Sequence, residues 1–176
     1  MIEVLVSRLG LDSTSQAYVV VLQEKGGSRI LPIWIGQPEA ESIVMHLHSI
    51  KRARPLTHDL CRNLILGMGG SLQRVEITRV EKNTYYAELH IARGSETYTI
   101  DARPSDSIAV ALRLEAPIFA SEALLTTIEE DDSAEDMTLT EPPGSETSEP
   151  GGELTAEQLK EYLEHLRPED FGKFKL

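Results

Sequence analysis

The first hundred residues are dominated by short apolar stretches with the two-residue period of β-strands. Apolar side chains alternate along residues 1–8, and residues 17–23 form an apolar run typical of a strand buried on both faces. Gly26 and Gly27 predict a hairpin turn into a third strand at residues 29–35. The same reasoning predicts three further strands and a last short extended segment, at residues 72–80, 84–91, 97–102 and 116–120.

Three other segments have the helical period. Pro38 suits the first turn of a helix, and apolar residues follow it at helical spacing as far as Ile50. Ser105 is a suitable cap for another helix, and because residues 108–112 are all apolar we expect that helix to be deeply buried. Between these two, a helix is predicted to begin at Thr57, with one apolar face formed by Leu60, Cys61, Leu64, Ile65 and Met68.

The order of three strands followed by a helix occurs twice, in residues 1–50 and in residues 72–115. The two helix starts also match locally, residues 41–47 against residues 106–112. This repeat predicts an α+β fold in which residues 1–125 form a single domain of two duplicated β-β-β-α units with a mainly antiparallel sheet. Chance similarity between two short strings is the alternative.

The rest of the chain has a different composition. Residues 126–153 are rich in Glu, Asp, Ser, Thr, Pro and Gly and have few apolar residues, which predicts a disordered acidic linker. Residues 154–176 are expected to form a C-terminal amphipathic helix followed by an aromatic tail. The apolar positions of this helical appendage are Leu159, Tyr162, Leu163 and Leu166.

The formal net charge of -12 is concentrated in this C-terminal region. Residues 1–120 carry 13 basic and 13 acidic side chains, whereas residues 121–176 carry 4 and 16. A neutral body with ten arginines does not repel nucleic acid as a uniformly acidic chain would. The acidic segment is then either a solubilising linker or a mimic of nucleic acid that competes for these arginines.

Cysteine content and hydropathy indicate where the protein works. The single cysteine, Cys61, excludes an intramolecular disulfide and favours a reducing compartment. No apolar run approaches the roughly 18 residues of a membrane helix, and the start of the chain lacks the pattern of a signal peptide. We therefore expect a cytoplasmic protein with no membrane partner.

Asp101 and Asp106 are the strongest candidates for chemistry, because one ends a strand and the other lies in the first turn of the next helix. Two carboxylates at one edge of a sheet would suit Mg²⁺ or Mn²⁺, which polarise phosphate and activate water. Arg103, between them, is suited to clamp a phosphate. The alternative is structural: Asp106 favours the helix dipole, and Asp101 and Arg103 form an ion pair.

Two other helix starts carry charged residues of the same kind. Glu39 and Glu41 occupy the corresponding place in the first repeat and are candidate metal ligands, although favourable first-turn charge also explains them. His58 and Asp59 are a candidate general base and carboxylate, but adjacent residues of a helix do not face each other, so capping and packing remain the alternative. Trp34 is expected in the core or an interface.

Three motifs together resemble the bifunctional nuclease family: residues 31–36 with Glu39, residues 54–59, and residues 101–106 followed by Ala109 and Arg113. The resemblance covers residues 1–125. It implies an α+β fold and a nuclease that cleaves both RNA and DNA, but it supplies no catalytic residues. On the same motifs, Arg54 and Arg113 join Arg103 as candidate substrate-binding residues.

Two functions of different classes remain. The first is a metal-assisted, sequence-tolerant nuclease for single-stranded RNA or DNA, and the clustered carboxylates favour it. The second is a non-catalytic, homo-oligomeric binding module in which the same charges hold the fold and an interface. The neutral body, without a basic patch that the sequence reveals, favours the second. The candidate catalytic residues of the first are Asp101, Asp106, His58 and Asp59.

Overall fold

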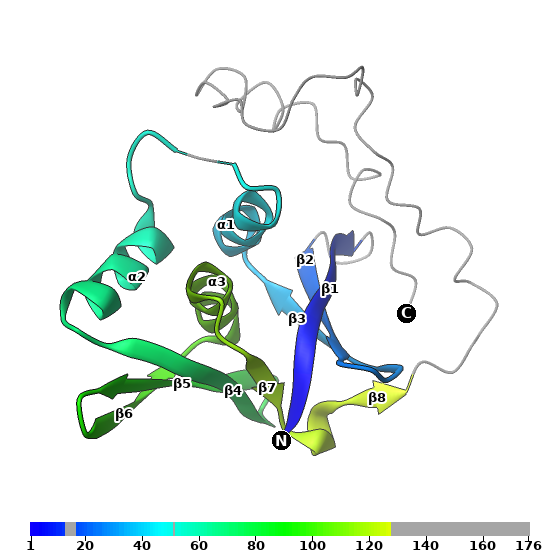
Figure 1. The fold of residues 1–176 in the computed structure, drawn as a ribbon. Coiled ribbons are helices and arrows are strands. Elements are labelled where there is room, and N and C mark those ends of the chain that lie inside the picture. Colours follow the sequence, from blue (N-terminus) through cyan, green and yellow to red (C-terminus); the bar gives the residue numbers. More distant parts are fainter. Residues whose placement is uncertain (13–16, 51, 128–176) are drawn as a thin grey trace.

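The predicted strands assemble into one mixed sheet of eight strands, with the order β6-β5-β4-β7-β1-β2-β3-β8 (Figure 1). The computed structural model describes residues 1–12, 17–50 and 52–127. The strands are β1 (Ile2–Asp12), β2 (Ala17–Glu24), β3 (Arg29–Ile35), β4 (Ser71–Glu81), β5 (Thr84–Arg93), β6 (Glu96–Ala102), β7 (Ile118–Ala120) and β8 (Thr126–Thr127). The helices are α1 (Gln37–Leu47), α2 (Thr57–Gly67), α3 (Pro104–Leu114) and the 3₁₀ helix η1 (Glu122–Leu124).

The short strand β7 joins two three-stranded arms. It pairs antiparallel with β1 and parallel with β4, and every other pair in the sheet is antiparallel. The arm β1-β2-β3 leads into α1, and the arm β4-β5-β6 leads into α3. The α+β class, the mainly antiparallel sheet and the repeated β-β-β-α order are therefore confirmed. That the two units arose by duplication stays a prediction.

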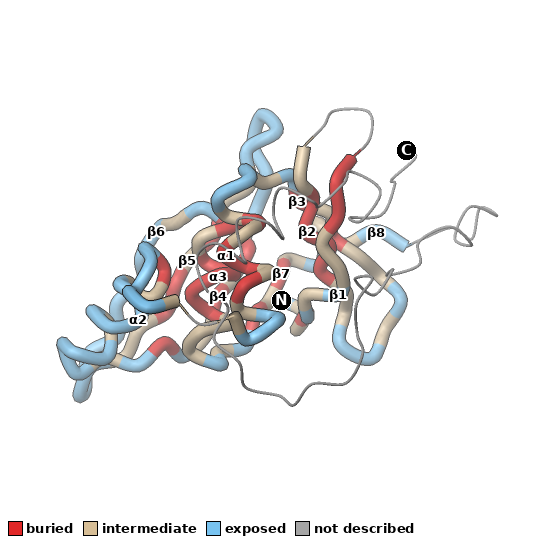
Figure 2. Tube along the Cα trace, turned by 90° about the horizontal axis from the view of Figure 1, so that it is seen from above, coloured by how far each residue is buried: buried red, intermediate tan, exposed pale blue. Residues whose placement is uncertain are grey.

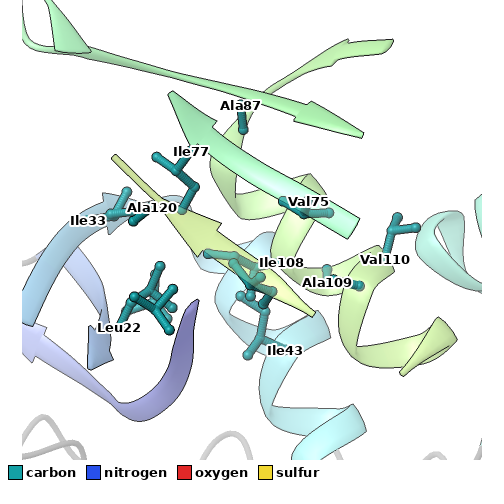
Figure 3. Close-up of a cluster of buried hydrophobic side chains, with 14 of the residues drawn as sticks. Leu22, Ile33, Ile43, Val75, Ile77, Ala87, Ile108, Ala109, Val110 and Ala120 are labelled. Atoms are coloured by element: carbon teal, nitrogen blue, oxygen red, sulfur yellow. The ribbon is translucent and has the colours of Figure 1, made fainter. Parts of the chain in front are cut away.

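The three helices lie on one side of the strongly curved sheet, and α3 lies between the two arms (Figure 1). As expected for a helix that is apolar on nearly all sides, α3 is almost completely buried: Ile108, Ala109 and Ala111 are fully buried. The core combines α3 with side chains from both arms and from α1, among them Leu22, Ile33, Ile43, Val75 and Ile77 (Figure 3). One continuous core of this kind therefore runs through both arms of the single sheet.

The apolar face predicted for α2 is only partly buried. Cys61 and Ile65 pack against the core. Leu60 and Leu64 are each 53% exposed and Met68 is 64% exposed, and α2 is among the most exposed elements of the fold (Figure 2). The predicted apolar face therefore has a buried part and an exposed part. Helix α2 packs mainly against α3 and β4, and the exposed part of its apolar surface faces solvent.

The observed boundaries differ slightly from the predicted ones. Strand β1 continues to Asp12, and α1 ends at Leu47 rather than at residue 50. Strand β8 pairs with β3, so the folded part extends two residues past the boundary placed at residue 125. The remainder of the acidic linker and the predicted C-terminal helix lie outside the described residues. In the described part of the chain, no helix has the length and hydropathy of a membrane-spanning segment.

Replacing Ile108 tests the role of α3. Ile108→Ala should lower the free energy of unfolding by about 2–5 kcal/mol, because it leaves a cavity inside a close-packed core. Urea unfolding followed by circular dichroism measures the change. Ile100→Ala is the matched control, because Ile100 is 46% exposed on the edge strand β6, and we expect it to cost less than about 1 kcal/mol. Equal losses for the two variants would contradict a core centred on α3.

Candidate functional site

A buried histidine connects the three helices. His58, in the first turn of α2, is 8% exposed. Its Nδ1 lies 2.7 Å from Ser42 Oγ on α1, and its Nε2 lies 3.0 Å from Asp106 Oδ1 on α3. Arg113 Nη2 donates to Ser42 Oγ at 3.0 Å. The Ser42 hydroxyl proton is then directed to Nδ1, and the Nε2 proton to Asp106, which gives a continuous chain of hydrogen bonds.

Arg103 completes the arrangement on the solvent side. Its Nε donates to Asp106 Oδ2 at 2.8 Å, and its Nη2 donates to Glu39 Oε1 at 2.6 Å. Among the described residues, Nη1 of Arg103 has no hydrogen-bond partner. The Arg103 side chain remains 67% exposed. Its guanidinium therefore neutralises the two carboxylates and still presents an N–H group to solvent.

The hydrogen bonds of Asp106 determine its charge state. Burial raises the pKa of this carboxyl group, but the hydrogen bonds from Arg103 and His58 outweigh burial and bring the pKa below its usual value of 3.8. Asp106 is therefore ionised at neutral pH. The ionised carboxylate is the acceptor for the Nε2 proton of His58, so Nδ1 faces the Ser42 hydroxyl.

A second ion pair lies behind the histidine. Arg113 Nε donates to Asp59 Oδ1 at 2.6 Å, and Asp59 Oδ2 accepts from the Leu56 backbone at the start of α2. Burial raises the pKa of Asp59, but the Arg113 and Leu56 hydrogen bonds lower it by more, so the net shift is downward. The Arg113 side chain is only 6% exposed. The pair therefore locks α2 against α3, and Arg113 does not reach solvent.

Two hollows meet at Arg103. One, of about 380 Å³, is lined by residues of α1, α2 and α3, including Ser42, His58, Asp106 and Arg103. The other, of about 360 Å³, lies between the end of β3, the β4–β5 turn and the start of α3. Trp34, Tyr85 and Arg103 are among its lining residues. Trp34, expected in the core or an interface, is 42% exposed and donates from its Nε1 to Asp12.

The structure separates Asp101 from Asp106. Asp101 stands opposite Glu88 in the β5–β6 ladder, whereas the next residue, Ala102, stands opposite the core residue Ala87. Because successive side chains of a strand point to opposite faces, Asp101 is on the face away from the helices. Asp106 is on the helix side, where it contacts His58. Asp101 and Asp106 were expected at one edge of the sheet, but the alternation of side chains along β6 puts them on opposite faces.

The other predicted residues fall into two groups. His58, Asp106, Arg103 and Glu39 come together around the α1–α2–α3 hollow, and Glu41 lines the same hollow while accepting a hydrogen bond from Gln37. The second group lies elsewhere: Arg54 is exposed before α2, Asp59 and Arg113 pair with each other behind the histidine, and Asp101 is on the other face of the sheet.

The carboxylates of this hollow fit a metal poorly. Both oxygens of Asp106 accept hydrogen bonds from Arg103 or His58, and Glu39 accepts from Arg103. Among the described residues, only Glu76, Glu88 and His90 form a group of three or more potential metal ligands with converging donor atoms. A metal shared by Asp106 and Glu39 would have to displace Arg103.

Sequence reasoning missed Ser42 and the aromatic hollow. Ser42 lies one turn into α1 and has no motif of its own, so only the packing of α1 against α3 reveals its contact with His58. Tyr85 lies on β5, and the curvature of the sheet brings it near the end of β3. Neither contact has a short-range sequence pattern.

Acid should weaken the site through Asp106. Because the native state binds this proton less tightly than the unfolded chain, the contribution is fully present above about pH 4 and is lost as the pH falls through the depressed native pKa. We expect the difference in unfolding free energy between the wild type and Asp106→Asn to narrow between pH 6 and pH 3, measured by urea unfolding. Asp101→Asn is the matched control, because it makes the same chemical change at an exposed position. If the difference in unfolding free energy between the wild type and Asp106→Asn stayed constant with pH, this would contradict an ionised, hydrogen-bonded Asp106.

The chain has relatives over its whole length and over the folded domain. It is 37% identical to an uncharacterised protein of Mycobacterium tuberculosis over 169 residues, which is 96% of this chain and 97% of that protein. It is 29% identical to bifunctional nuclease 1 of Oryza sativa over 110 residues, or 61% of this chain and 33% of the rice protein. It is 27% identical to bifunctional nuclease 1 of Arabidopsis thaliana over 103 residues, or 57% and 32%. The model of the bifunctional nuclease domain matches residues 20–133, so the chain belongs to the bifunctional nuclease domain family.

Proposed function

We propose that this protein hydrolyses phosphodiester bonds in single-stranded RNA and DNA with little sequence specificity. The observation that carries the proposal is the position of Arg103, between a hollow with a histidine–carboxylate pair and a hollow with two aromatic side chains. Family membership supports the same activity, because the plant relatives are named as bifunctional nucleases. These relatives match over about a third of their own length.

Arg103 would bind the phosphate and the aromatic hollow would bind a neighbouring base. The exposed guanidinium has one N–H edge left for a phosphate oxygen. Trp34 and Tyr85 line a hollow of about 360 Å³, which is of the size expected for a small-ligand site. Base stacking on aromatic side chains depends little on base identity, so this mode of binding is compatible with both RNA and DNA.

The histidine would act as the general base. An attacking water molecule transfers its proton through the Ser42 hydroxyl to His58 Nδ1 as the new P–O bond forms. Asp106 stabilises the resulting imidazolium through Nε2. The bond from phosphorus to the leaving oxygen then breaks, and that oxygen takes the proton back from the relay. Arg103, rather than Mg²⁺ or Mn²⁺, provides the positive charge next to the phosphate. The Arg103 guanidinium is already hydrogen-bonded to the Glu39 and Asp106 carboxylates, which a metal would otherwise need as ligands.

A cleavage assay on single-stranded RNA and DNA oligonucleotides tests the nuclease. We expect the purified wild type to cleave both, and the activity to persist in EDTA. His58→Gln should lower kcat/KM by about 100-fold or more, the usual contribution of a general base. Arg103→Gln should raise KM and lower kcat. Arg93→Gln is the matched control, because it removes an exposed arginine at the end of β5, away from both hollows.

Folding must be checked for each variant, because the same residues hold the three helices together. Circular dichroism and thermal unfolding separate loss of structure from loss of chemistry. A folded His58→Gln variant with full activity would contradict the proposed base. Activity that requires Mg²⁺ or Mn²⁺ and vanishes in EDTA would contradict the role given to Arg103. Absence of cleavage by the wild type under all these conditions would reject the nuclease.

One observation favours the second candidate, a non-catalytic homo-oligomeric module. Leu60 and Leu64 lie one helical turn apart on the exposed side of α2, with Leu56 and Met68 beyond them. Such a row can face its own copy across a two-fold axis, since the same side chains would meet from both subunits. We therefore take a second copy of this chain as the partner of this surface.

Light scattering coupled to size-exclusion chromatography tests this surface. We expect the wild type to be a dimer and the double variant Leu60→Glu, Leu64→Glu to be a monomer, because four buried carboxylates would face one another across the interface. Leu5→Glu is the control, since Leu5 is also 53% exposed but lies on β1. A monomeric wild type, or a double variant that still dimerises, would exclude α2 as the interface.

A further inference from the structure

The face of the sheet away from the helices carries a second group of titratable side chains. Glu76 on β4 stands opposite Glu88 on β5, and His90 follows Glu88 by two residues on the same strand. The neighbouring pair in this ladder, Ile77 and Ala87, belongs to the core. The alternation of strand side chains therefore places Glu76, Glu88 and His90 together on the outer face.

These three side chains converge. His90 Nε2 lies 3.2 Å from Glu76 Oε2 and 3.7 Å from Glu88 Oε2, and one ligand atom of each residue lies within 4.8 Å of the other two. The group is also shielded from water: His90 is 9% exposed, and the Glu76 side chain is 19% exposed. Separations of this size are those of ligands around one small ion bound at about 2.0–2.2 Å from each.

The histidine nitrogen at the centre of the group is buried without a well-formed hydrogen bond. Nε2 of His90 approaches Glu76 Oε2 to 3.2 Å, but the geometry is not that of a hydrogen bond. The other ring nitrogen, Nδ1, lies 3.5 Å from Thr99 Oγ1 on β6. If Nδ1 carries the proton toward Thr99, the lone pair of Nε2 points at two carboxylate oxygens. A buried acceptor that faces two other acceptors is unfavourable, and a metal ion bound by all three atoms would satisfy them together.

The surrounding residues also prepare the group for a cation. Arg74 Nε donates to Glu76 Oε1 at 2.6 Å, which fixes this carboxylate with its other oxygen toward His90. On the other side of Glu88, Asp101 on β6 is its direct partner in the ladder. Three carboxylates thus occupy adjacent strands, and Arg74 contacts one of them, Glu76.

We propose that Glu76, Glu88 and His90 bind a divalent transition-metal ion, with Zn²⁺ as the ion that fits best. One imidazole nitrogen and two carboxylate oxygens are a common donor set for Zn²⁺, whereas Mg²⁺ and Ca²⁺ prefer oxygen alone. Asp101, the ladder partner of Glu88, lies next to this group but is not one of the three converging ligands. The ion ties β4 and β5 together and is independent of the hollow at His58.

Calorimetric titration with Zn²⁺, after treatment with EDTA, tests the site in the full-length chain. We expect a site with one Zn²⁺ per chain and a dissociation constant in the micromolar range or below. His90→Gln should weaken binding at this site at least 10-fold, whereas His48→Gln, which changes an exposed histidine at the end of α1, should leave it unchanged. Binding to the acidic C-terminal region is common to all variants and cancels in the comparison. Mg²⁺ should not compete at the same concentration.

Two results would overturn the proposal. Equal Zn²⁺ binding by the wild type and His90→Gln would show that the carboxylates are held by a protonated His90 rather than by a metal. The same conclusion follows if nitrogen NMR of the wild type shows no change at His90 Nε2 when Zn²⁺ is added. The NMR measurement needs no variant, so it remains decisive even if His90→Gln fails to fold. Glu88→Gln, which keeps the histidine, should also weaken Zn²⁺ binding. The nuclease assay is unaffected by either outcome.

Discussion

The burial of α3 is the constraint on which the rest of the structure depends. A helix that is apolar on nearly every side must be covered on every side. The two arms of the sheet curve around it, and α1 and α2 pack against the remaining surface. The polar residues at its two ends are then drawn into the interior with it. Asp106 at the first turn and Arg113 at the last therefore need partners from neighbouring helices, and His58, Asp59 and Ser42 provide them.

This requirement explains why stability and chemistry are hard to separate at this site. Each polar group in the Arg113–Ser42–His58–Asp106 chain satisfies the next, and a buried group left without its partner costs about 1–3 kcal/mol. The same chain has the geometry of a proton relay that opens into a hollow. Arg113 is enclosed and serves the fold, whereas Arg103 is exposed and joins the two hollows. Solvent access, rather than residue type, therefore separates the structural arginine from the candidate substrate-binding one.

Features with a local cause were predictable from the sequence. The apolar run of α3 indicated a buried helix, and Gly26 and Gly27 indicated the turn between β2 and β3, where Gly26 has a positive φ angle. The exposure of Leu60 and Leu64 was not predictable, because periodicity shows that a helix has an apolar face but not whether another element covers it. The contact of His58 with Ser42 depends on how the three helices pack, which no short-range pattern reveals.

The cluster on the outer face was missed for a different reason. In a helix, residues two apart point to different faces, so that spacing does not bring two side chains together. In a strand, the same spacing places Glu88 and His90 side by side on one face. The strand period also divides the short string at the end of β6. Asp101 faces Glu88 on the outside, Ala102 faces Ala87 on the inside, and Arg103 lies in the turn to α3. Three consecutive residues thus lie on the outer face of the sheet, against the core and beside the His58 hollow, respectively. A substitution in this string is therefore best interpreted by the face it changes rather than by its distance along the chain from the proposed catalytic residues.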